Sequence, residues 1–340
     1  NGIISTEVSE QVAPGRVEYV KLYFDENGRI SKEDARWRMR LSEGLAPYQD
    51  EKTGKYGYVG EDGTWVIAPT FDFARDFKDG YARTNYGGSM VLRDEPYGGQ
   101  WGLIDTLGHE TIPCRYYYLD TPGEGLAAFR LEQFGNYGYV DVKGNVAISP
   151  RFSVARPFSG GVAVVSYNNV NFGLVDRNGG EVSSFRYKRI GRFNDGLAPF
   201  NTDLYGMNFQ GMEPRCGYID TEGREVIPAK WDDAAEFSEM RAAVMRFGTN
   251  AEDFYDARWG YIATNGQLVV PFKYHEAYPF SCGLARVFIK GLRYGYIDRQ
   301  GNEVVPCKYQ EAEDFHDFRA KVKQYDRVLT IDETGQIVEQ

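Results

Sequence analysis

Short runs in which apolar and polar residues alternate recur along the whole chain. Residues 284–288 and 294–298 show this alternation most clearly, and residues 303–306 begin a third run. A period of two over several residues indicates β-strands with one buried face. Residues 298–301 begin with Asp and end with Gly, an order typical of a reverse turn, and Pro306 limits pairing on one side of the third strand. The pattern predicts a three-stranded antiparallel meander.

The middle strand of this meander contains a phrase that the chain repeats. The phrase is an aromatic residue, a glycine, a large apolar residue and an aliphatic residue. Its clear copies begin at Tyr56, Trp101, Tyr137, Phe172, Cys216, Trp259 and Tyr294, and weaker relatives lie around Tyr23 and Leu329. Self-similarity of this kind is the signature of a repeat architecture.

The strand before each copy carries an alanine that gives the length of the unit. These alanines are Ala46, Ala82, Ala127, Ala163, Ala198, Ala242, Ala285 and Ala320. They are separated by 36, 45, 36, 35, 44, 43 and 35 residues, so the unit is about 35 residues long. The three longer units carry their insertions in one slot, between the alanine strand and the repeated phrase, at residues 86–100, 201–215 and 247–258. Insertions confined to one slot project from one edge of an array, which is often the binding face.

We therefore expect an all-β fold of tandem three-stranded meanders of about 35 residues. The connector at residues 309–315 is expected to be irregular or a short helical turn. The array is interpreted as a single repeat domain over 1–340, with a degenerate N-terminal cap at 1–46, seven units over 47–320 and a C-terminal half-unit cap at 321–340. Degenerate ends favour a curved or superhelical open array, because caps shield terminal strand edges; the alternative is a closed ring like a β-propeller.

The repeated phrase resembles that of the bacterial WG-repeat family, also described as a WG-containing β-repeat or KWG-like family. Tryptophan holds the first position at Trp101 and Trp259, while Gly60 and Ala263 depart from the aspartate that usually closes the phrase. That aspartate is present at Asp105, Asp141, Asp176, Asp220 and Asp298. The resemblance implies a recognition or scaffold module, frequently in exported or surface proteins, with no shared catalytic residues. An exported, periplasmic or cell-surface location is expected on this basis, and the first residue, Asn1, fits a mature exported chain or a trimmed one.

Composition and charge narrow the range of partners. Hydrophobic residues make up 42% of the chain and aromatic residues 15%, enough for a long continuous core, while the net charge is −10. A nucleic-acid binder needs a clustered basic face, and the longest basic run, residues 36–40, alternates with apolar residues. Nucleic acid is therefore not an expected partner. Since no run approaches the roughly 20 apolar residues that cross a bilayer, membrane insertion is not expected either.

Residues with catalytic or metal-binding chemistry are scattered through the sequence. Each recurring aspartate begins a turn one unit away from the next, so capping of the turn is the preferred interpretation. The acidic segment 252–256 is read as a solvated loop rather than a calcium site. The glycine pairs at 87–88, 98–99 and 179–180 are read as turns. The three histidines are His109, His275 and His316, and the four cysteines, expected to be buried or half-buried thiols, are Cys114, Cys216, Cys282 and Cys307. No catalytic residue, metal site or cofactor is predicted.

Aromatic residues in the insertions lie outside the repeated frame and are the candidate binding residues. They are Tyr86, Tyr97, Tyr205, Phe209, Phe254 and Tyr255. Exposed aromatic side chains on loops are common anchors of protein interfaces. The favoured hypothesis is a non-catalytic recognition or scaffold protein that binds another protein through the insertion-bearing edge. The alternatives are a carbohydrate-binding module, a self-assembling surface or filament component, and, least favoured, an enzyme such as a glycoside hydrolase.

Overall fold

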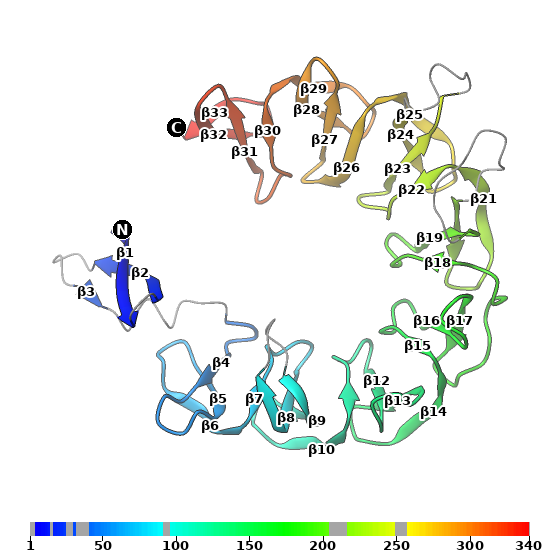
Figure 1. Ribbon diagram of the computed structural model, residues 1–340. Coiled ribbons are helices and arrows are strands. Elements are labelled where there is room, and N and C mark those ends of the chain that lie inside the picture. The colour runs from blue at the N-terminus through cyan, green and yellow to red at the C-terminus, as the bar shows by residue number, and fades with distance from the viewer. Residues whose placement is uncertain are drawn as a thin grey trace. The chain divides into compact units, whose positions relative to one another are not determined.

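The chain folds entirely into strands and turns over the residues described. The computed structural model describes residues 4–13, 16–24, 30–31, 41–90, 96–203, 216–248 and 257–339. These residues form 33 strands, and no helix occurs among them (Figure 1). The expected all-β class is confirmed. Two compact units divide the chain, Asn1–Arg151 and Phe152–Gln340, called unit 1 and unit 2 below.

Unit 1 contains four antiparallel sheets, in the orders β1-β2-β3, β4-β5-β6, β7-β8-β9-β10 and β11-β12-β13-β14. Its strands are β1 (Ile4–Ala13), β2 (Arg16–Phe24), β3 (Ile30–Ser31), β4 (Ala46–Gln49), β5 (Tyr56–Val59), β6 (Trp65–Phe71), β7 (Phe73–Ala74), β8 (Tyr81–Met90), β9 (Pro96–Asp105), β10 (Glu110–Tyr116), β11 (Tyr118–Leu119), β12 (Leu126–Arg130), β13 (Tyr137–Asp141) and β14 (Val146–Phe152).

Unit 2 contains five sheets, in the orders β15-β16-β17, β18-β19-β20-β21, β22-β23-β24-β25, β26-β27-β28-β29 and β30-β31-β32-β33. Its strands are β15 (Val154–Ala155), β16 (Val162–Ser166), β17 (Phe172–Asp176), β18 (Arg189–Ile190), β19 (Leu197–Asn201), β20 (Cys216–Asp220), β21 (Glu225–Trp231), β22 (Asp233–Ala234), β23 (Arg241–Arg246), β24 (Arg258–Ala263), β25 (Leu268–Tyr274), β26 (Glu276–Ser281), β27 (Leu284–Ile289), β28 (Arg293–Asp298), β29 (Glu303–Tyr309), β30 (Glu311–Ala312), β31 (Arg319–Gln324), β32 (Arg327–Asp332) and β33 (Ile337–Glu339).

The expected meander is present in most of the sheets, and most sheets add one short strand to it. In the sheet β15-β16-β17 the outer strand is reduced to the isolated bridges of Tyr187 with Phe172 and of Glu181 with Val175. The connector between repeats supplies the short strand, as β7 does for the sheet that continues with β8. The connector at 309–315 was expected to be irregular or a short helical turn; residues 311–312 form a strand instead, while residues 313–315 are irregular. The two strand residues of a connector pair with the alanine strand, for example Phe73 with Asn85 and Ala74 with Thr84. These backbone pairs satisfy polar groups that a buried loop would leave without partners. Each sheet keeps open edges, and no described sheet closes on itself.

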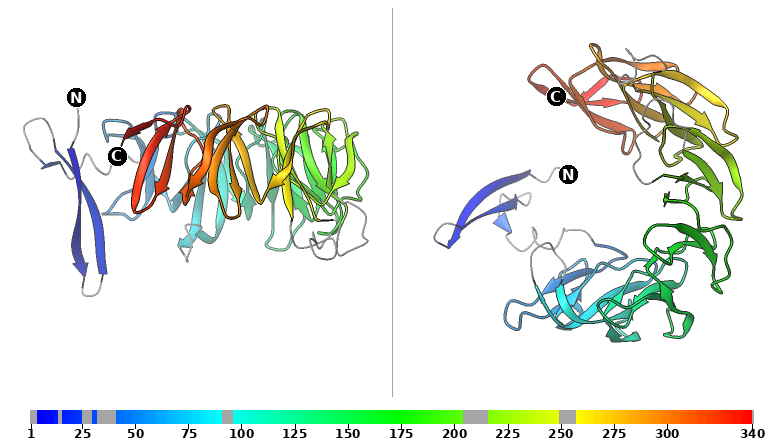
Figure 2. Two further views of the ribbon diagram at one scale, coloured as in Figure 1. Left: turned by 90° about the horizontal axis from the view of Figure 1, so that it is seen from above. Right: turned by 45° about the vertical axis from the view of Figure 1, so that its right-hand side comes forward.

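The hydrophobic core lies between consecutive sheets rather than inside any one of them. One cluster in unit 2 joins Tyr261 and Val270 of one sheet to Phe280, Val287 and Ile297 of the next. In Figure 2 the successive sheets of unit 2 pack face to face. Both faces of an internal sheet are therefore buried, which explains why its strands depart from simple apolar–polar alternation.

A buried tyrosine in the repeated phrase links each of several sheets to the one that follows it. Its hydroxyl donates to a backbone carbonyl oxygen in the connector of the next sheet. The bonds are Tyr58 to Arg75 at 2.7 Å, Tyr218 to Ala235 at 2.8 Å, Tyr261 to Tyr278 at 2.8 Å and Tyr296 to Glu313 at 2.6 Å. All four rings are 0% exposed. The phenol ring thus packs in the core, and its hydroxyl donates to a backbone carbonyl oxygen that the pairing of the connector leaves without a partner.

The glycine of the phrase allows the outer strand to cross close above it. A Cβ added to Gly57 would lie 2.4 Å from the carbonyl oxygen of Ile67 and 2.7 Å from the nitrogen of Pro69. The equivalent Gly295 would meet the carbonyl oxygen of Val305 at 2.6 Å. Because these neighbours are backbone atoms, no side-chain rotation relieves the contact.

The aspartate that closes the phrase caps the turn, as the sequence predicts. In Asp298, Oδ1 accepts the backbone N–H groups of Gln300 and Asn302, each at 2.9 Å. Asp105, Asp141, Asp176, Asp220 and Asp332 make the same pair of bonds in their turns. Partial burial acts to raise the pKa of the Asp298 carboxyl, but hydrogen bonds from Asn302 and from backbone N–H groups outweigh it, so this pKa is lowered.

These capped turns predict a loss of stability in acid. A carboxyl whose pKa is lowered by folding stabilises the fold above its unfolded pKa of about 4, and this stabilisation disappears as the pH falls through the folded pKa. The pKa values of Asp105, Asp141, Asp220 and Asp332 are lowered in the same direction. The urea midpoint is expected to fall as the pH decreases below about 4. Asp298→Asn, which keeps an acceptor oxygen, should make the fall shallower; an unchanged midpoint down to about pH 2 would contradict the prediction.

Candidate functional site

The two ends of each sheet differ in what they present to solvent. One end, called the hairpin-tip end below, carries the connection between the alanine strand and the strand of the repeated phrase. The three predicted insertions fall in this connection. The other end, called the turn end, carries the tight turn before the alanine strand and the Asp-capped turn after the phrase.

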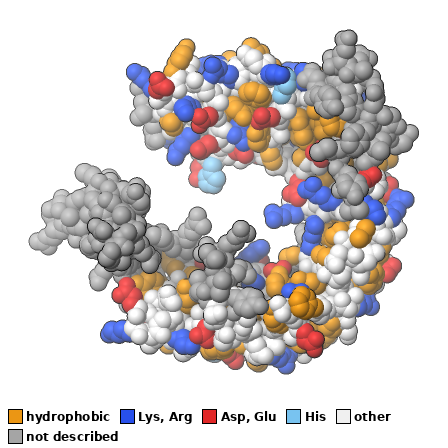
Figure 3. All heavy atoms as spheres, in the orientation of Figure 1, with side chains coloured by type: hydrophobic (Ala, Val, Ile, Leu, Met, Phe, Trp, Pro, Cys, Tyr) orange, Lys and Arg blue, Asp and Glu red, His pale blue; other side chains and the backbone are white. Residues whose placement is uncertain are grey.

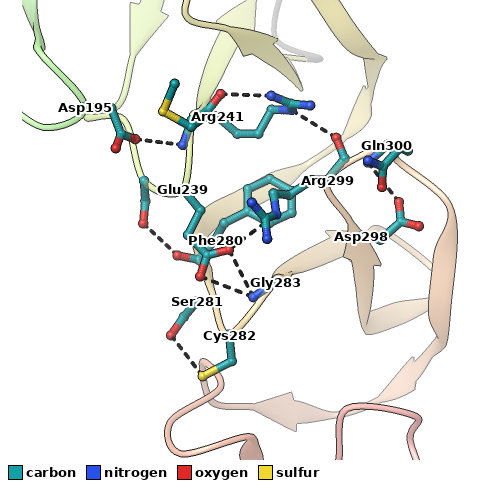
Figure 4. A network of polar contacts seen from close by, with 12 residues as sticks. Asp195, Glu239, Arg241, Phe280, Ser281, Cys282, Gly283, Asp298, Arg299 and Gln300 are labelled. Carbon is teal, nitrogen blue, oxygen red and sulfur yellow. Dashed lines mark hydrogen bonds and ion pairs between the residues drawn. The ribbon is translucent and has the colours of Figure 1, made fainter.

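The turn end of unit 2 is joined from sheet to sheet by polar contacts (Figure 4). Asp195 Oδ2 accepts the backbone N–H of Met240 at 2.7 Å, and Met240 occupies the equivalent turn one sheet later. Glu239 repeats the arrangement: its two carboxylate oxygens lie 3.2 and 3.0 Å from the backbone nitrogen of Gly283. Arg299 Nε lies 3.6 Å from Glu239 Oε2. The carboxylates at this end therefore act as links between consecutive sheets.

Serine hydroxyls add a second row of links in the same direction. Ser238 Oγ donates to the carbonyl oxygen of Phe280 at 2.7 Å, and Ser281 Oγ donates to that of Phe315 at 2.6 Å. A hollow of about 340 Å³ lies beside these links, and it is lined by Asn194, Asp195, Glu236, Phe237, Ser238, Glu239 and Pro279. Glu236 accepts the backbone N–H of Arg192 at 2.9 Å. Since the carboxylates that line the hollow hold backbone groups, the arrangement serves cohesion between the sheets.

The hairpin-tip end of unit 1 exposes large apolar side chains. Phe134 and Leu131, in the connection between β12 and β13, are 93% and 59% exposed. Tyr86, on the lengthened β8–β9 hairpin, is 36% exposed, and its ring centroid lies 5.4 Å from that of Phe71. A side chain as exposed as Phe134 contributes little to the core, so packing does not account for it.

Arg130 fixes the base of the tip that carries Phe134. Its Nη1 donates to the carbonyl oxygen of Gln133 at 2.9 Å. Its guanidinium carbon lies 4.6 Å from the ring centroid of Tyr137 and 5.6 Å from that of Tyr118. Burial, followed by the neighbouring Asp120 carboxylate, raises the pKa of Tyr118, so this phenol stays neutral. The cation–π contacts hold a rigid base, which lowers the entropy cost when a partner meets the tip.

Unit 2 exposes apolar side chains at the equivalent position of several sheets. They are Tyr167 and Val170 after β16, Leu292 after β27, and Tyr325 after β31. The ring of Tyr167 packs at a tilt of 38° against that of Phe185, with ring centroids 4.7 Å apart, and Tyr167 is 42% exposed. In Figure 3 acidic, basic and hydrophobic side chains are interspersed over the sheets of unit 2 near the C-terminus.

The structure places two of the six predicted binding residues, Tyr86 and Tyr97, on the β8–β9 hairpin. Tyr97 pairs with Ser89 through the backbone. The other four, Tyr205, Phe209, Phe254 and Tyr255, lie outside the described residues, as does the acidic segment 252–256. The exposed residues Leu131, Phe134, Tyr167 and Tyr325 were missed, because they lie in units of ordinary length. Their place in the repeat could have identified them. Each lies in the connection between the alanine strand and the phrase, where a large apolar residue within a short polar tip stands out when the repeats are aligned.

The insertion in the β8–β9 unit is a longer hairpin rather than a separate loop. Gly88 pairs with Gly98 inside the two strands, so the glycine pairs at 87–88 and 98–99 were wrongly read as turns. Gly87, Gly98 and Gly99 have positive φ values, which twist the hairpin where the insertion begins. The pair at 179–180 does form a turn, closed by a bond from Gly179 N–H to Asp176 O at 3.0 Å.

The histidines and cysteines occupy separate places in the fold. His109 Nδ1 lies 3.1 Å from Asp105 Oδ2, and His275 Nδ1 lies 2.9 Å from the backbone nitrogen of Lys290. The expected burial of the thiols is confirmed: Cys216 is buried and the other three are half-buried. Burial raises the pKa of both Cys114 and Cys307 to about 11, which keeps them protonated and unreactive. Over the described residues, no three His, Cys, Asp or Glu side chains are grouped to hold a metal ion.

A family model describes most of the chain. The model for the WG containing repeat matches residues 56–88, 101–133, 137–170, 172–203, 217–246, 259–292 and 294–327. The chain belongs to the WG containing repeat family. Each match begins at or next to the repeated phrase and continues through the outer strand, the connector and the next alanine strand. This WG-repeat chain is thus a tandem β-repeat protein.

Several solved structures share a distant likeness with the WG-repeat chain. BamB from Moraxella catarrhalis is 12% identical, with a TM-score of 0.38, and the likeness covers 76% of this chain and 88% of that one. The computationally designed Ika8 protein is 12% identical, with a TM-score of 0.38 and coverage of 77% and 84%. The Dos1 propeller is 10% identical, with a TM-score of 0.38 and coverage of 76% and 81%. None of the curated proteins matches the chain. The described part of the chain holds no helix of the length and apolarity needed to cross a bilayer.

Proposed function

We propose that this WG-repeat array is a non-catalytic recognition scaffold that binds a partner protein through its hairpin-tip end. The observation that carries the proposal is Phe134, which is 93% exposed on a tip whose base is fixed by Arg130. Aromatic side chains that are presented rigidly and lose little entropy on burial are typical interface anchors. Leu131 on the same tip and Tyr86 on the β8–β9 hairpin are further exposed apolar side chains at this end of unit 1.

The recurrence of exposed residues in one slot supports the same function. In unit 2 the equivalent tips expose Tyr167, Leu292 and Tyr325. A residue that served only its own sheet would be buried against its neighbours, as the tyrosines of the repeated phrase are. Repeat proteins commonly carry recognition residues on one face and packing residues elsewhere.

The test pairs a tip variant with a matched control. A photo-crosslinking residue at position 134 first identifies the partner, and the same residue at position 107 reports the background. Leu131→Ala/Phe134→Ala is then expected to weaken binding of the purified partner by roughly tenfold or more, measured by calorimetry. Leu107→Ala removes a side chain that is 73% exposed at the turn end, and should leave the affinity unchanged. Equal crosslinking from both positions, or an unchanged affinity of the tip variant, would argue against this surface.

Carbohydrate binding is the second candidate, and Tyr167 favours it. Its ring is partly exposed and packs against the ring of Phe185, and its hydroxyl donates to Glu181 Oε1 at 3.0 Å, so an aromatic side chain lies beside a carboxylate. Sugar-binding sites combine these groups, because the apolar face of a sugar stacks on a ring while its hydroxyls meet polar side chains. Binding on a glycan array that is lost in Tyr167→Ala would establish this function; an array without binders would remove it.

A further inference from the structure

The tight turn before each alanine strand has a two-residue tip in which both residues have positive φ. In the turn over residues 238–241, Ser238 N–H donates to Arg241 O at 2.8 Å, and Arg241 N–H donates to Ser238 O at 3.1 Å. Glycine adopts positive φ without a steric penalty, so it suits such a tip. The second tip residue is a glycine with φ between 79° and 83° in six described turns, namely Gly44, Gly80, Gly125, Gly161, Gly196 and Gly283.

Two turns of unit 2 carry a large apolar residue in place of this glycine. Met240 has a φ of 65° and Phe318 a φ of 59°. A bulky side chain at positive φ is strained and persists only where the surrounding structure holds it. Asp195 holds Met240, because its Oδ2 accepts the Met240 N–H at 2.7 Å. In the next turn Glu239 makes the same bond to Gly283, so the bond does not require a side chain at this position.

Packing does not account for Met240 and Phe318 either. Apart from its chain neighbours, a Cβ added to any of the six glycines meets no atom within 4 Å. A side chain at this position therefore points into solvent, and Met240 is 49% exposed while Phe318 is 62% exposed. Two strained and exposed apolar side chains that contribute little to the core indicate contact with another molecule.

Met240 and Phe318 lie at the turn end of unit 2, two sheets apart. Met240 precedes β23 and Phe318 precedes β31, and the turn before β27, between them, carries Gly283, which presents no side chain. Shared hydrophobic clusters pack these three sheets in sequence. Packed sheets lie about 10 Å apart, so the two side chains are separated by about 20 Å. About six residues of an extended segment cover this span, so one segment can reach both side chains by passing over Gly283.

Arg241 places a positive charge on the path between the two apolar side chains. Its Nη1 donates to the carbonyl oxygen of Met240 at 3.0 Å, and its Nε donates to that of Arg299, in the next sheet, at 3.0 Å (Figure 4). Arg299 lies beside the carboxylate of Glu239, at 3.6 Å. Arg241 forms no ion pair within the part of the chain that the structure describes. Its guanidinium group is therefore available to a carboxylate of another molecule.

We propose that the turn end of unit 2 is a second recognition surface, which binds an extended, acidic segment of a partner protein. Met240 and Phe318 contact two apolar residues of this segment about six positions apart. Arg241 binds a carboxylate that lies between them, as arginines do in the recognition of acidic motifs. The surface lies at the opposite end of the sheets from the hairpin tips, so its function does not depend on the partner proposed there.

Selection from a random peptide library displayed on phage tests this surface. The full chain is the target, and Met240→Gly/Phe318→Gly serves for counter-selection. Peptides enriched on the wild type are expected to carry two apolar residues about six positions apart, with Asp or Glu between them. As synthetic peptides they should bind the double variant at least about tenfold more weakly, and Arg241→Gln about threefold more weakly, in fluorescence anisotropy. Leu292→Ala removes a side chain that is 57% exposed at the hairpin-tip end and should leave the affinity unchanged.

Stability measurements separate a docking role of the two side chains from a structural one. Glycine relieves the strain at positions 240 and 318, so the urea midpoint of the double variant should equal or exceed that of the wild type. A lower midpoint would show that the side chains support the fold, and would overturn the proposal. It is also overturned if no peptide is enriched, if the enriched peptides lack the paired apolar residues or the carboxylate, or if they bind the double variant as tightly as the wild type.

Discussion

Replacing Gly57 with alanine is expected to destabilise unit 1 by about 3 kcal/mol. The added Cβ would lie 2.4 Å from the carbonyl oxygen of Ile67 and 2.7 Å from the nitrogen of Pro69. Relief requires the outer strand β6 to move away. That movement breaks the pairing of Tyr56 with Phe71 and pulls Phe71, 4% exposed, out of the core. Urea denaturation followed by tryptophan fluorescence and circular dichroism measures the change.

Gly60→Ala is the matched control, three residues further along the same chain segment. A Cβ on Gly60 would lie 3.4 Å from Val66 Cγ2, an ordinary contact with a side chain. Its expected effect is below about 1 kcal/mol, because alanine also restricts the unfolded chain. Similar losses of stability in the two variants would show that the close approach of the outer strand is not the reason for a glycine at position 57.

Replacing Tyr261 with alanine is expected to cost about 4 kcal/mol. The ring is 0% exposed and meets Phe280 edge-on, with centroids 5.1 Å apart. Its removal leaves a cavity between two sheets of unit 2, and the carbonyl oxygen of Tyr278 loses its donor. A second variant separates the loss of packing from the loss of the hydrogen bond. Tyr261→Phe keeps the ring and removes only the hydroxyl donor, so the free energy of unfolding should fall by about 1–2 kcal/mol.

Tyr325→Ala is the control for this series. Its ring is 78% exposed, so the stability should change by less than about 0.5 kcal/mol. In thermal and urea unfolding, we expect the loss of stability to be largest for Tyr261→Ala, smaller for Tyr261→Phe and smallest for Tyr325→Ala. If Tyr261→Phe were as unstable as Tyr261→Ala, the stabilisation would come from the hydrogen bond of the hydroxyl rather than from packing of the ring.

The parts of the fold that depend on local chemistry could be predicted from the sequence. The strands followed from alternation, the repeat from the recurring phrase, and the capped turns from the position of residues such as Asp298. Two-residue strands such as β7 could not be predicted, because a segment that short carries no period and forms only when the alanine strand offers it a ladder. The hydroxyl bond of Tyr261 was also hidden, since its acceptor lies in the next sheet.

The sequence singled out the slot between the alanine strand and the phrase, but not most of the side chains that are exposed there. The slot between the alanine strand and the phrase does carry the exposed apolar side chains. Phe134 and Leu131 were missed, because greater length was taken as the mark of function and their tip has the ordinary length. Sequence gives the position of a side chain along a repeat, whereas its exposure depends on whether the neighbouring sheet covers it.

The links between sheets have a consequence for how such a gene changes length. Tyr58, Tyr218, Tyr261 and Tyr296 each donate to the connector of the next sheet, so each of these junctions offers the same donor to the same acceptor. An in-frame duplication of one repeat would insert a sheet whose two faces already match its new neighbours. Such an event would add one more hairpin tip without requiring a new core, so the number of exposed tips can change separately from the packing that supports them.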